Sequence, residues 1–120
     1  MIVLGIEGAL GIFSVAVVRG SDVLSVREIA GNTAIESGLQ TIDDTLREAA
    51  LVLGSPETSL QPDRIGVGVG PGRFTGLRIA VTYAKALAQA WNIPLVPIPS
   101  SELVPEGEVA RLGERVRTKE

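Results

Sequence analysis

Few residues in this sequence could carry out catalysis, because its 120 residues include neither histidine nor cysteine. That absence removes the commonest general base, the usual zinc ligands and every thiolate nucleophile. The serine and threonine hydroxyls therefore have no histidine to activate them. Lys85, a different kind of nucleophile, falls in the middle of a predicted helix. We expect no catalytic residue and no metal site, so any chemistry would rest on carboxylates and backbone groups.

Glu7 is the carboxylate with the best placement for a chemical role, at the end of the first predicted strand. A sheet could present it there to a cleft, where it could act as a general base. No second carboxylate is placed by spacing to be its partner. Asp43 and Asp44 lie on the polar face of a predicted helix, where solvation explains them. A solvated turn residue is the alternative interpretation of Glu7.

A glycine-rich loop at residues 70–74 could bind an anion, since it lies between a predicted strand and the start of a predicted helix. Backbone N–H groups and the helix dipole favour negative charge at such a place. No glycine here begins the G-x-G-x-x-G or G-x-x-x-x-G-K spacing of the nucleotide-binding loops. A structural loop is therefore the alternative. The candidate anion or nucleotide contacts are Gly70, Gly72, Arg73, Thr75 and Glu7.

The elements that position these residues begin with three β-rich runs, at residues 1–6, 11–18 and 23–29. Residues 19–22 are short enough for a hairpin turn, so the runs predict an antiparallel meander. Later strands are predicted at 64–69 and 94–98.

Two amphipathic helices are predicted between these strands. In the first, apolar residues recur at helical spacing over 35–53. Thr33 and Glu36 have the spacing of a capping box before it, and Gly54 with Pro56 marks its end. The second runs over 76–91, with Thr75 as its N-cap and Asn92 and Pro94 as its stop.

The predicted order βββαβαβ indicates an α/β fold with a mixed five-stranded sheet. Right-handed crossovers would place the helices on the faces of that sheet. Residues 102–120 form a charged tail. Within it, a short helix is suggested by the spacing of Val109, Leu112 and Val116.

The second helix is apolar over a wider arc than one sheet can cover. Its strongly polar residues, at spacings of four, three and four, fall on one narrow stripe: Arg78, Thr82, Lys85 and Gln89. A helix with one buried side needs an apolar arc of only about 100°. The surplus apolar surface predicts a second packing partner, either the first helix of the same chain or another protein.

Charge and composition narrow the choice of partner. The formal net charge is −3 and the pI is near 5.0, so the chain has no overall basic field for nucleic acid. The aromatic residues are scattered, so no stacking platform for bases is predicted. No apolar run reaches the roughly 18 residues of a membrane span, and the start lacks the pattern of a signal peptide. We expect a cytoplasmic protein with no membrane partner.

The sequence resembles the bacterial TsaB (YeaZ) family over residues 1–101. GPGRFTGLR at 70–78, NIPLV at 92–96 and the serines at 100–101 are the most recognisable matches. The resemblance implies an actin-like, ribonuclease H-like fold. It also implies a role in making threonylcarbamoyladenosine in tRNAs that read codons beginning with A. In that family TsaB is a noncatalytic subunit that pairs with the transferase TsaD, and the ATPase TsaE joins them.

The family pairs through its first two helices, with TsaD or, in isolation, with a second TsaB, and contacts tRNA only indirectly. This agrees with the surplus apolar surface of the second helix. Transferred to this sequence, the resemblance implies an interface of Ile35, Leu39, Ile42, Leu46, Leu77, Arg78, Val81, Ala84, Lys85, Ala88 and Trp91.

The sequence departs from the family pattern in three places. Residues 7–11, EGALG, lack the hydroxyl of an actin-like phosphate loop, so neither ATP nor another cofactor is expected. Residues 32–36 replace a His-Ser-Glu-like stretch. The second actin-like domain is expected to be absent. A metallopeptidase is excluded, because a chain without histidine cannot supply the His-x-x-x-His pair of TsaD-like proteins. Two alternatives stay open: an actin-like nucleotide-binding or phosphotransfer module, and a homodimeric interaction protein outside the tRNA pathway.

Overall fold

The computed structural model describes residues 1–9, 11–55, 60–70 and 74–99. The predicted tail at 102–120, with its short helix, lies outside the described residues. So do Gly72 and Arg73 of the predicted anion loop. Residues 1–101, which the resemblance predicts to be one actin-like domain, also end outside the described residues.

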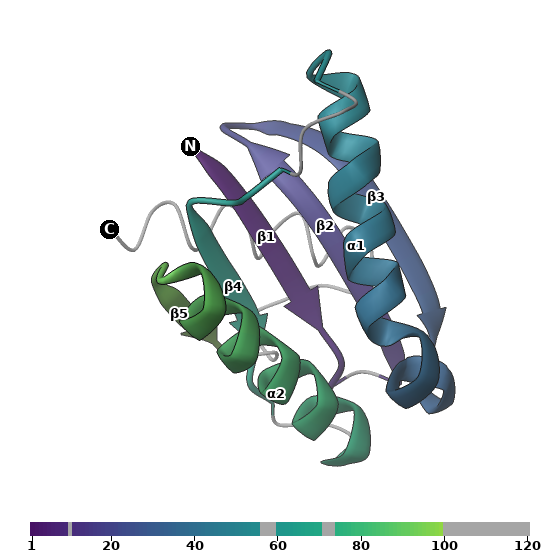
Figure 1. Cartoon of the computed structure of the whole chain (residues 1–120). Helices are drawn as coiled ribbons and strands as arrows, with labels where there is room; N and C mark the ends of the chain where they lie inside the picture. The colour runs from purple at the N-terminus through teal and green to yellow at the C-terminus, as the bar shows by residue number, and fades with distance from the viewer. Residues whose placement is uncertain (10, 56–59, 71–73, 100–120) are drawn as a thin grey trace.

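Five strands form one mixed sheet in the order β3-β2-β1-β4-β5 (Figure 1). The strands β1 (Ile2–Glu7), β2 (Ile12–Arg19) and β3 (Asp22–Ala30) pair antiparallel, as a meander. The strands β4 (Arg64–Gly68) and β5 (Leu95–Ile98) extend the sheet in parallel beyond β1. The predicted order of elements along the chain, βββαβαβ, and the mixed five-stranded sheet are confirmed.

Local turn chemistry fixes the hairpin between β2 and β3. Arg19 pairs with Asp22, which leaves a two-residue turn. Gly20 adopts φ 62°, a left-handed conformation that glycine accepts without a steric penalty. The pairing of β2 with β3 shifts in register between Val17 and Val18, close to this turn. The hairpin predicted at residues 19–22 is therefore confirmed.

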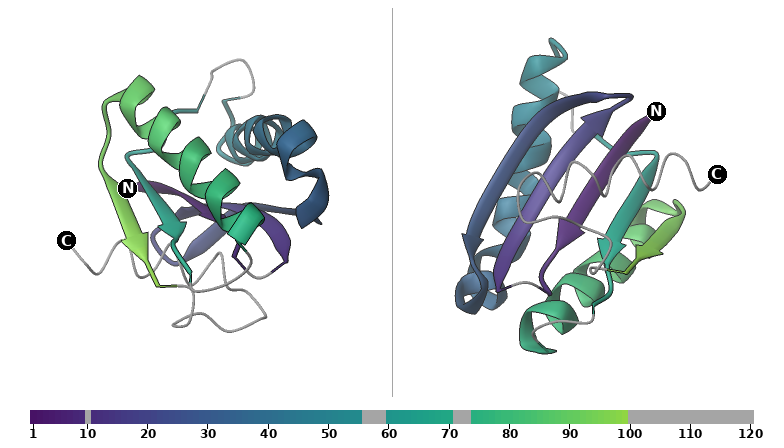
Figure 2. Two further views of the ribbon diagram at one scale, coloured as in Figure 1. Left: turned by 90° about the horizontal axis from the view of Figure 1, so that it is seen from below. Right: turned by 180° about the vertical axis from the view of Figure 1, so that it is seen from behind.

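Both described helices, α1 (Ala34–Val52) and α2 (Phe74–Trp91), lie on the same face of the sheet (Figure 2). The prediction placed helices on the faces of the sheet, and the strand order explains the difference. The chain moves from β3 over to β4 and then on to β5, across the sheet in one direction. Right-handed crossovers in one direction bring successive helices to one side.

The ends of both helices follow the sequence signals. Gly54 has φ 76°, and the N–H groups of Gly54 and Ser55 donate to the carbonyls of Leu51 and Ala50. Asn92 has φ 56°, with matching bonds from Asn92 to Gln89 and from Ile93 to Ala88. Both are Schellman motifs, which satisfy the last carbonyls of a helix.

Thr33 occupies the N-cap position of α1 as predicted, but the predicted capping box is absent, and the predicted N-cap of α2 is wrong. A single 3₁₀ turn, η1 (Gly31–Thr33), precedes α1, and the Thr33 hydroxyl donates backward to the Ala30 carbonyl at 2.7 Å. Thr33 makes no side-chain cap, so the capping box does not form. Thr75 lies inside α2, which begins one residue earlier. A cap requires one backbone conformation at one residue, which the preceding turn decides.

The main core lies between the sheet and the two helices. Leu4, Ile6 and Phe13 contribute from the first two strands, and Ile65 and Val67 from β4. The core side chains supplied by the helices are Ala34, Ile42, Leu46, Ala49, Ala80, Ala84 and Ala88. The alternate sheet residues Val3, Ala16, Val18 and Ile98 form smaller buried clusters.

Candidate functional site

The two helices meet at Tyr83 of α2 and Gly38 of α1. The Tyr83 ring packs edge-on against Phe13, with centroids 6.1 Å apart and planes at 89°. Its hydroxyl lies 3.1 Å from the Ala34 carbonyl oxygen and 3.2 Å from that of Ile35, and donates to them. A Cβ at residue 38 would come within 2.6 Å of Tyr83 Cε2. A glycine is therefore required for this close helix contact.

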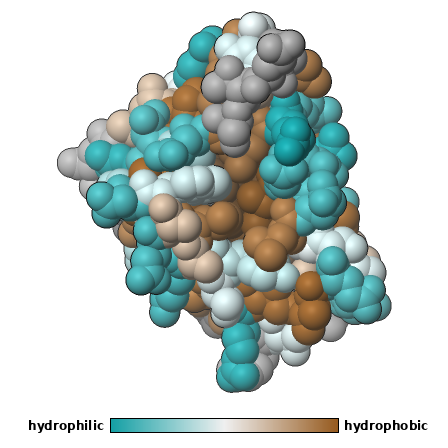
Figure 3. Space-filling model, in the orientation of Figure 1, coloured by the Kyte–Doolittle hydropathy of each residue, from teal (hydrophilic) through white to brown (hydrophobic). Residues whose placement is uncertain are grey.

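Two large apolar side chains of α1 are exposed to solvent next to this contact. Ile35 is 67% exposed and Leu39 is 54% exposed. They are four residues apart, so they share one flank of the helix. The hydroxyl contact between Tyr83 and the Ile35 carbonyl places that flank next to α2. The space-filling view shows apolar surface between the two helices, with polar residues on either side (Figure 3).

Four of the predicted interface residues are instead part of the domain's own core. Ala84 is fully buried, Ile42 and Leu46 are nearly so, and Ala88 is 9% exposed. They face the sheet, because they lie on the side of each helix that packs on Phe13, Val15 and Val67. The burial of these four side chains places them in the packing of the helices on the sheet and leaves them little or no surface for a partner.

The other predicted residues of α2 lie nearer the surface. Leu77, Val81 and Trp91 are half-buried, and Arg78 and Lys85 are exposed. Most of the apolar surplus of α2 packs within the chain, where Ile79, Val81, Tyr83, Leu87 and Trp91 border the core. The exposed large apolar side chains on the helices belong to α1 instead, and Leu51 and Val52 add to them at its far end.

Glu7 is completely buried at the carboxyl end of β1. Its Oε1 accepts a hydrogen bond of 2.6 Å from the Ala9 N–H, so the carboxylate closes its own turn. The carboxylate also lies directly over Gly68 of β4, where a Cβ would overlap Oε2. The prediction of a solvated turn residue is wrong. The turn assignment is right, but the side chain points into the protein.

The backbones beside Glu7 also touch. A Cβ on Gly8 would collide with the carbonyl oxygen of Gly76, and one on Gly76 would collide with that of Gly8. The turn after β1 and the first turn of α2 are therefore in direct main-chain contact. This contact shows what the paired glycines do: they allow a close approach of two chain segments.

The predicted anion loop is only partly described. Gly70 is buried with φ 89°, and Thr75 is exposed on α2. The structure thus gives Thr75 a helical position in place of a capping one.

Metal ligation also finds no support in the described ranges. They contain no group of three or more carboxylate, histidine or cysteine side chains that could hold an ion. The full sequence lacks the histidines that TsaD-like metal binding would need. Among the described residues, no helix is long and apolar enough to cross a membrane.

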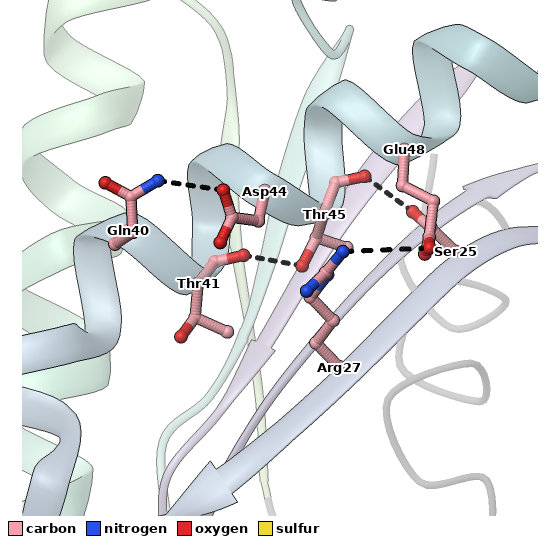
Figure 4. A network of polar contacts seen from close by, with 7 residues as sticks. All are labelled: Ser25, Arg27, Gln40, Thr41, Asp44, Thr45 and Glu48. Atoms are coloured by element: carbon pink, nitrogen blue, oxygen red, sulfur yellow. Dashed lines mark hydrogen bonds and ion pairs between the residues drawn. The ribbon is translucent and has the colours of Figure 1, made fainter.

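A polar network links α1 to β3 on the opposite flank of α1 (Figure 4). The Ser25 hydroxyl donates to the Thr45 carbonyl at 2.7 Å. Arg27 forms an ion pair with Glu48, with 3.7 Å between the Arg27 Nη2 and Glu48 Oε1 atoms. The Gln40 amide donates to Asp44 at 2.8 Å. A hollow of about 540 Å³ borders this network, lined by Arg27, Glu28, Ile29, Glu36, Ser37, Gln40, Thr41 and Asp44. These polar groups largely bind one another, so the network fastens α1 to the edge strand.

Sequence comparison relates this chain to two groups of tRNA-modifying proteins. The family model of TsaD, tRNA N6-adenosine threonylcarbamoyltransferase, matches residues 26–111. The chain is 32% identical over 115 residues to a protein of that name from Fusobacterium nucleatum, covering 82% of this chain and 32% of the relative. It is 33% identical over 85 residues to the tRNA threonylcarbamoyladenosine biosynthesis protein TsaB of Haemophilus influenzae. This match covers 71% of this chain and 34% of that relative.

A solved structure agrees with these matches. YeaZ from Pseudomonas aeruginosa superposes with a TM-score of 0.68 at 27% identity, over 83% of this chain and 45% of that chain. The chain spans about a third of the length of the two curated relatives and less than half of the YeaZ chain. TsaB and TsaD proteins share the actin-like, ribonuclease H-like fold, which the mixed sheet with its two helices reproduces. The chain belongs to the TsaD family, as a TsaB (YeaZ)-type member.

Proposed function

We propose that this chain is a noncatalytic subunit of the machinery that makes threonylcarbamoyladenosine in tRNA, and that it binds and stabilises a TsaD-like transferase subunit. The likeness to TsaB and YeaZ supports a part in that modification. The observation that carries the proposal is the exposed pair Ile35 and Leu39 on α1, beside the Tyr83 contact with α2. Large apolar side chains exposed together mark a binding surface.

The chemistry of the described residues supports an accessory role. Among the described residues, Glu7 is the one fully buried carboxylate, and the Ala9 N–H of its own turn donates to it. The Ser25 and Thr45 hydroxyls, which are buried as well, donate to backbone carbonyls. These groups complete the fold and do not converge on a cleft. Catalysis in the complex would then belong to the TsaD-like partner.

The experiment places a charge in the apolar surface without touching the core. Ile35→Glu and Leu39→Glu, singly and together, are mixed with a TsaD-like subunit from the same source, and the mass of the mixture is measured by light scattering. A partner interface predicts that the double variant loses the complex, with each single change weakening it roughly ten-fold or more through burial of an unpaired charge. Ala84→Glu is unsuitable, because Ala84 is fully buried and a glutamate there would disrupt the core.

Leu51→Glu provides the matched control, because Leu51 is 60% exposed on the same helix near its other end. We expect it to bind the TsaD-like subunit as well as the unchanged chain does. Thermal unfolding confirms that each variant is folded. Full binding by the folded double variant would refute the proposed surface.

A further inference from the structure

The sheet has a second face, on the side away from the two helices. The view from behind shows the strands in front and both described helices beyond them (Figure 2). Successive side chains of a strand point to opposite faces, so the residues that alternate with Leu4, Val15 and Val67 of the main core belong to this side. The second face defined in this way includes Val3, Gly5, Ala16, Val18, Gly66 and Ile98.

The apolar side chains of the second face are buried. Val3 is 2% exposed and Val18 is 3% exposed, and Ala16 and Ile98 have no exposed surface. They form small clusters of their own, apart from the main core. Within the part of the chain that the structure describes, no helix or strand lies over this face (Figure 2). An uncovered face of a sheet is normally polar and solvated, so this burial calls for a further layer on the sheet.

The middle of the second face lets a covering element come close. Gly5 pairs with Ala16 of β2 on one side and with Gly66 of β4 on the other. This row of three small residues crosses the sheet without a side chain larger than a methyl group. Val3 precedes the row along the strands, and Ile98 follows it. The backbone of a helix can approach such a row, while the larger apolar residues on either side contact its side chains.

Residues 102–120 have a sequence suited to this layer. Val109, Leu112 and Val116 recur at spacings of three and four, so a helix would place them on one side, as an apolar stripe. Gly113 lies four residues after Val109 and three before Val116, so it falls on the same side, where a residue without a side chain permits close packing. The other residues of the stretch are mostly charged, which suits the outer side of a covering helix.

The charges of the same stretch follow the direction of a helix. Glu106 and Glu108 come before the apolar stripe, and Arg115 and Arg117 come at its end. Acidic side chains near the first turn and basic side chains near the last turn stabilise a helix through its dipole. The charge order therefore supports a helix over residues 106–118.

The length of this segment and its connection also fit the second face. The buried residues reach from Ile98 on β5 to Ala16 on β2. That distance is three strand spacings, or about 14 Å, and a helix over 106–118 is about 20 Å long. Residues 99–105 span up to about 24 Å when extended, which is enough to return from the end of β5 over the sheet.

We propose that residues 106–118 form an amphipathic helix that docks on the second face of the sheet, with its apolar stripe against the row that contains Ala16. One chain then covers its sheet on both sides. The proposal is independent of the proposed function, since it concerns the face opposite to Ile35 and Leu39. The α1 side is left as the apolar surface open to a partner.

Thiol protection measures this cover directly, because the chain has no cysteine of its own. Ala16→Cys places one thiol on the second face, and Val67→Cys places one under the two helices. Each is made in the full chain, and again together with Leu112→Glu and Val116→Glu. The rate of reaction with a small thiol reagent is measured under native conditions.

The thiol of Ala16→Cys should be protected in the otherwise unchanged chain. With Leu112→Glu and Val116→Glu, we expect it to react at least about ten-fold faster, because the added charges cannot be buried on an apolar face without a partner. The thiol of Val67→Cys should stay protected in both chains, which shows that the change is local. Fast reaction of Ala16→Cys in the otherwise unchanged chain, or equal protection in both chains, would overturn the proposal.

Arg111→Glu is the matched control for the double change. It alters the net charge as much as the double change does, since it removes one positive charge and adds one negative charge. Residue 111 lies on the opposite side of the helix from Val109. We therefore expect the thiol of Ala16→Cys to remain as protected as in the unchanged chain. A loss of protection as large as that of the double change would refute docking through the apolar stripe.

Hydrogen exchange of the unchanged chain tests the docked helix without any substitution, and so decides the case in which the double variant unfolds. The amides of residues 106–118 should exchange at least about ten-fold more slowly than in a synthetic peptide of residues 102–120. Equal exchange rates in the chain and the peptide would contradict the docking. Protection that is lost on dilution to about 1 μM would assign the cover to a second copy, and the proposal would then be wrong.

Discussion

The ring of Tyr83 lies against the bare backbone of Gly38, and its hydroxyl reaches back to the first carbonyls of α1. This one contact joins the two helices that the proposed interface needs side by side. The contact requires that residue 38 have no side chain, and it includes the hydrogen bonds that the Tyr83 hydroxyl donates. The relative placement of α1 and α2 can therefore be tested through either residue.

Gly38→Ala should destabilise the fold although alanine favours helix. The new methyl group would lie 2.6 Å from Tyr83 Cε2 and 3.4 Å from Phe13 Cζ, so the rings must move. Overpacking of this kind costs about 1–3 kcal/mol, against a gain in helix propensity of about 1 kcal/mol. We expect a net loss of about 1 kcal/mol in urea unfolding. Ser37→Ala is the control, and equal stability of both variants would contradict the close contact.

Gly76→Ala should be more damaging, because its new methyl group would meet backbone. The opposing atom is the Gly8 carbonyl oxygen, which cannot rotate away as a side chain can. We expect a loss on the order of 3 kcal/mol in the free energy of unfolding, at the upper end for overpacking. The neighbouring exposed change Thr75→Ala should cost far less. A small and similar effect of both changes would show that the two segments separate easily.

Glu7→Ala should destabilise the protein by about 1–3 kcal/mol, because the buried Ala9 N–H loses its acceptor. Glu7→Gln keeps an acceptor oxygen on a side chain of nearly the same size, so we expect this variant to retain most of the stability. Chemical denaturation of both variants measures the difference. Unchanged stability in Glu7→Ala would show that the carboxylate does not hold the turn.

The position of Glu7 also leads to a prediction about nucleotide binding. We propose that the chain works without ATP, because the Glu7 carboxylate is buried at the end of β1 beside the glycine loop and already accepts the N–H of Ala9. Calorimetric titration with millimolar ATP and magnesium should give no binding heat. A saturable heat that disappears on chelating magnesium would instead favour the actin-like nucleotide-binding alternative.

The sequence by itself determined the elements and their order. Apolar spacing predicted α1 and α2, and Gly20, Gly54 and Asn92 predicted where the chain turns. These signals depend on the conformation of a few neighbouring residues, so they can be read locally. The predicted capping box at the start of α1 does not form, because the 3₁₀ turn that ends at Thr33 decides whether its hydroxyl can face forward.

Only the tertiary structure decided which side of each helix stays exposed. Ala84 and Ala86 are the same residue type two positions apart on α2, yet Ala84 is fully buried and Ala86 is exposed. On α1, Leu46 is in the core and Leu39 stands in solvent. Periodicity shows that a helix has an apolar side, but its width and direction depend on the sheet and on the second helix. The burial of the Glu7 carboxylate also depends on the tertiary structure. Gly68 of the neighbouring strand β4, 61 residues later in the sequence, leaves the space that the carboxylate fills.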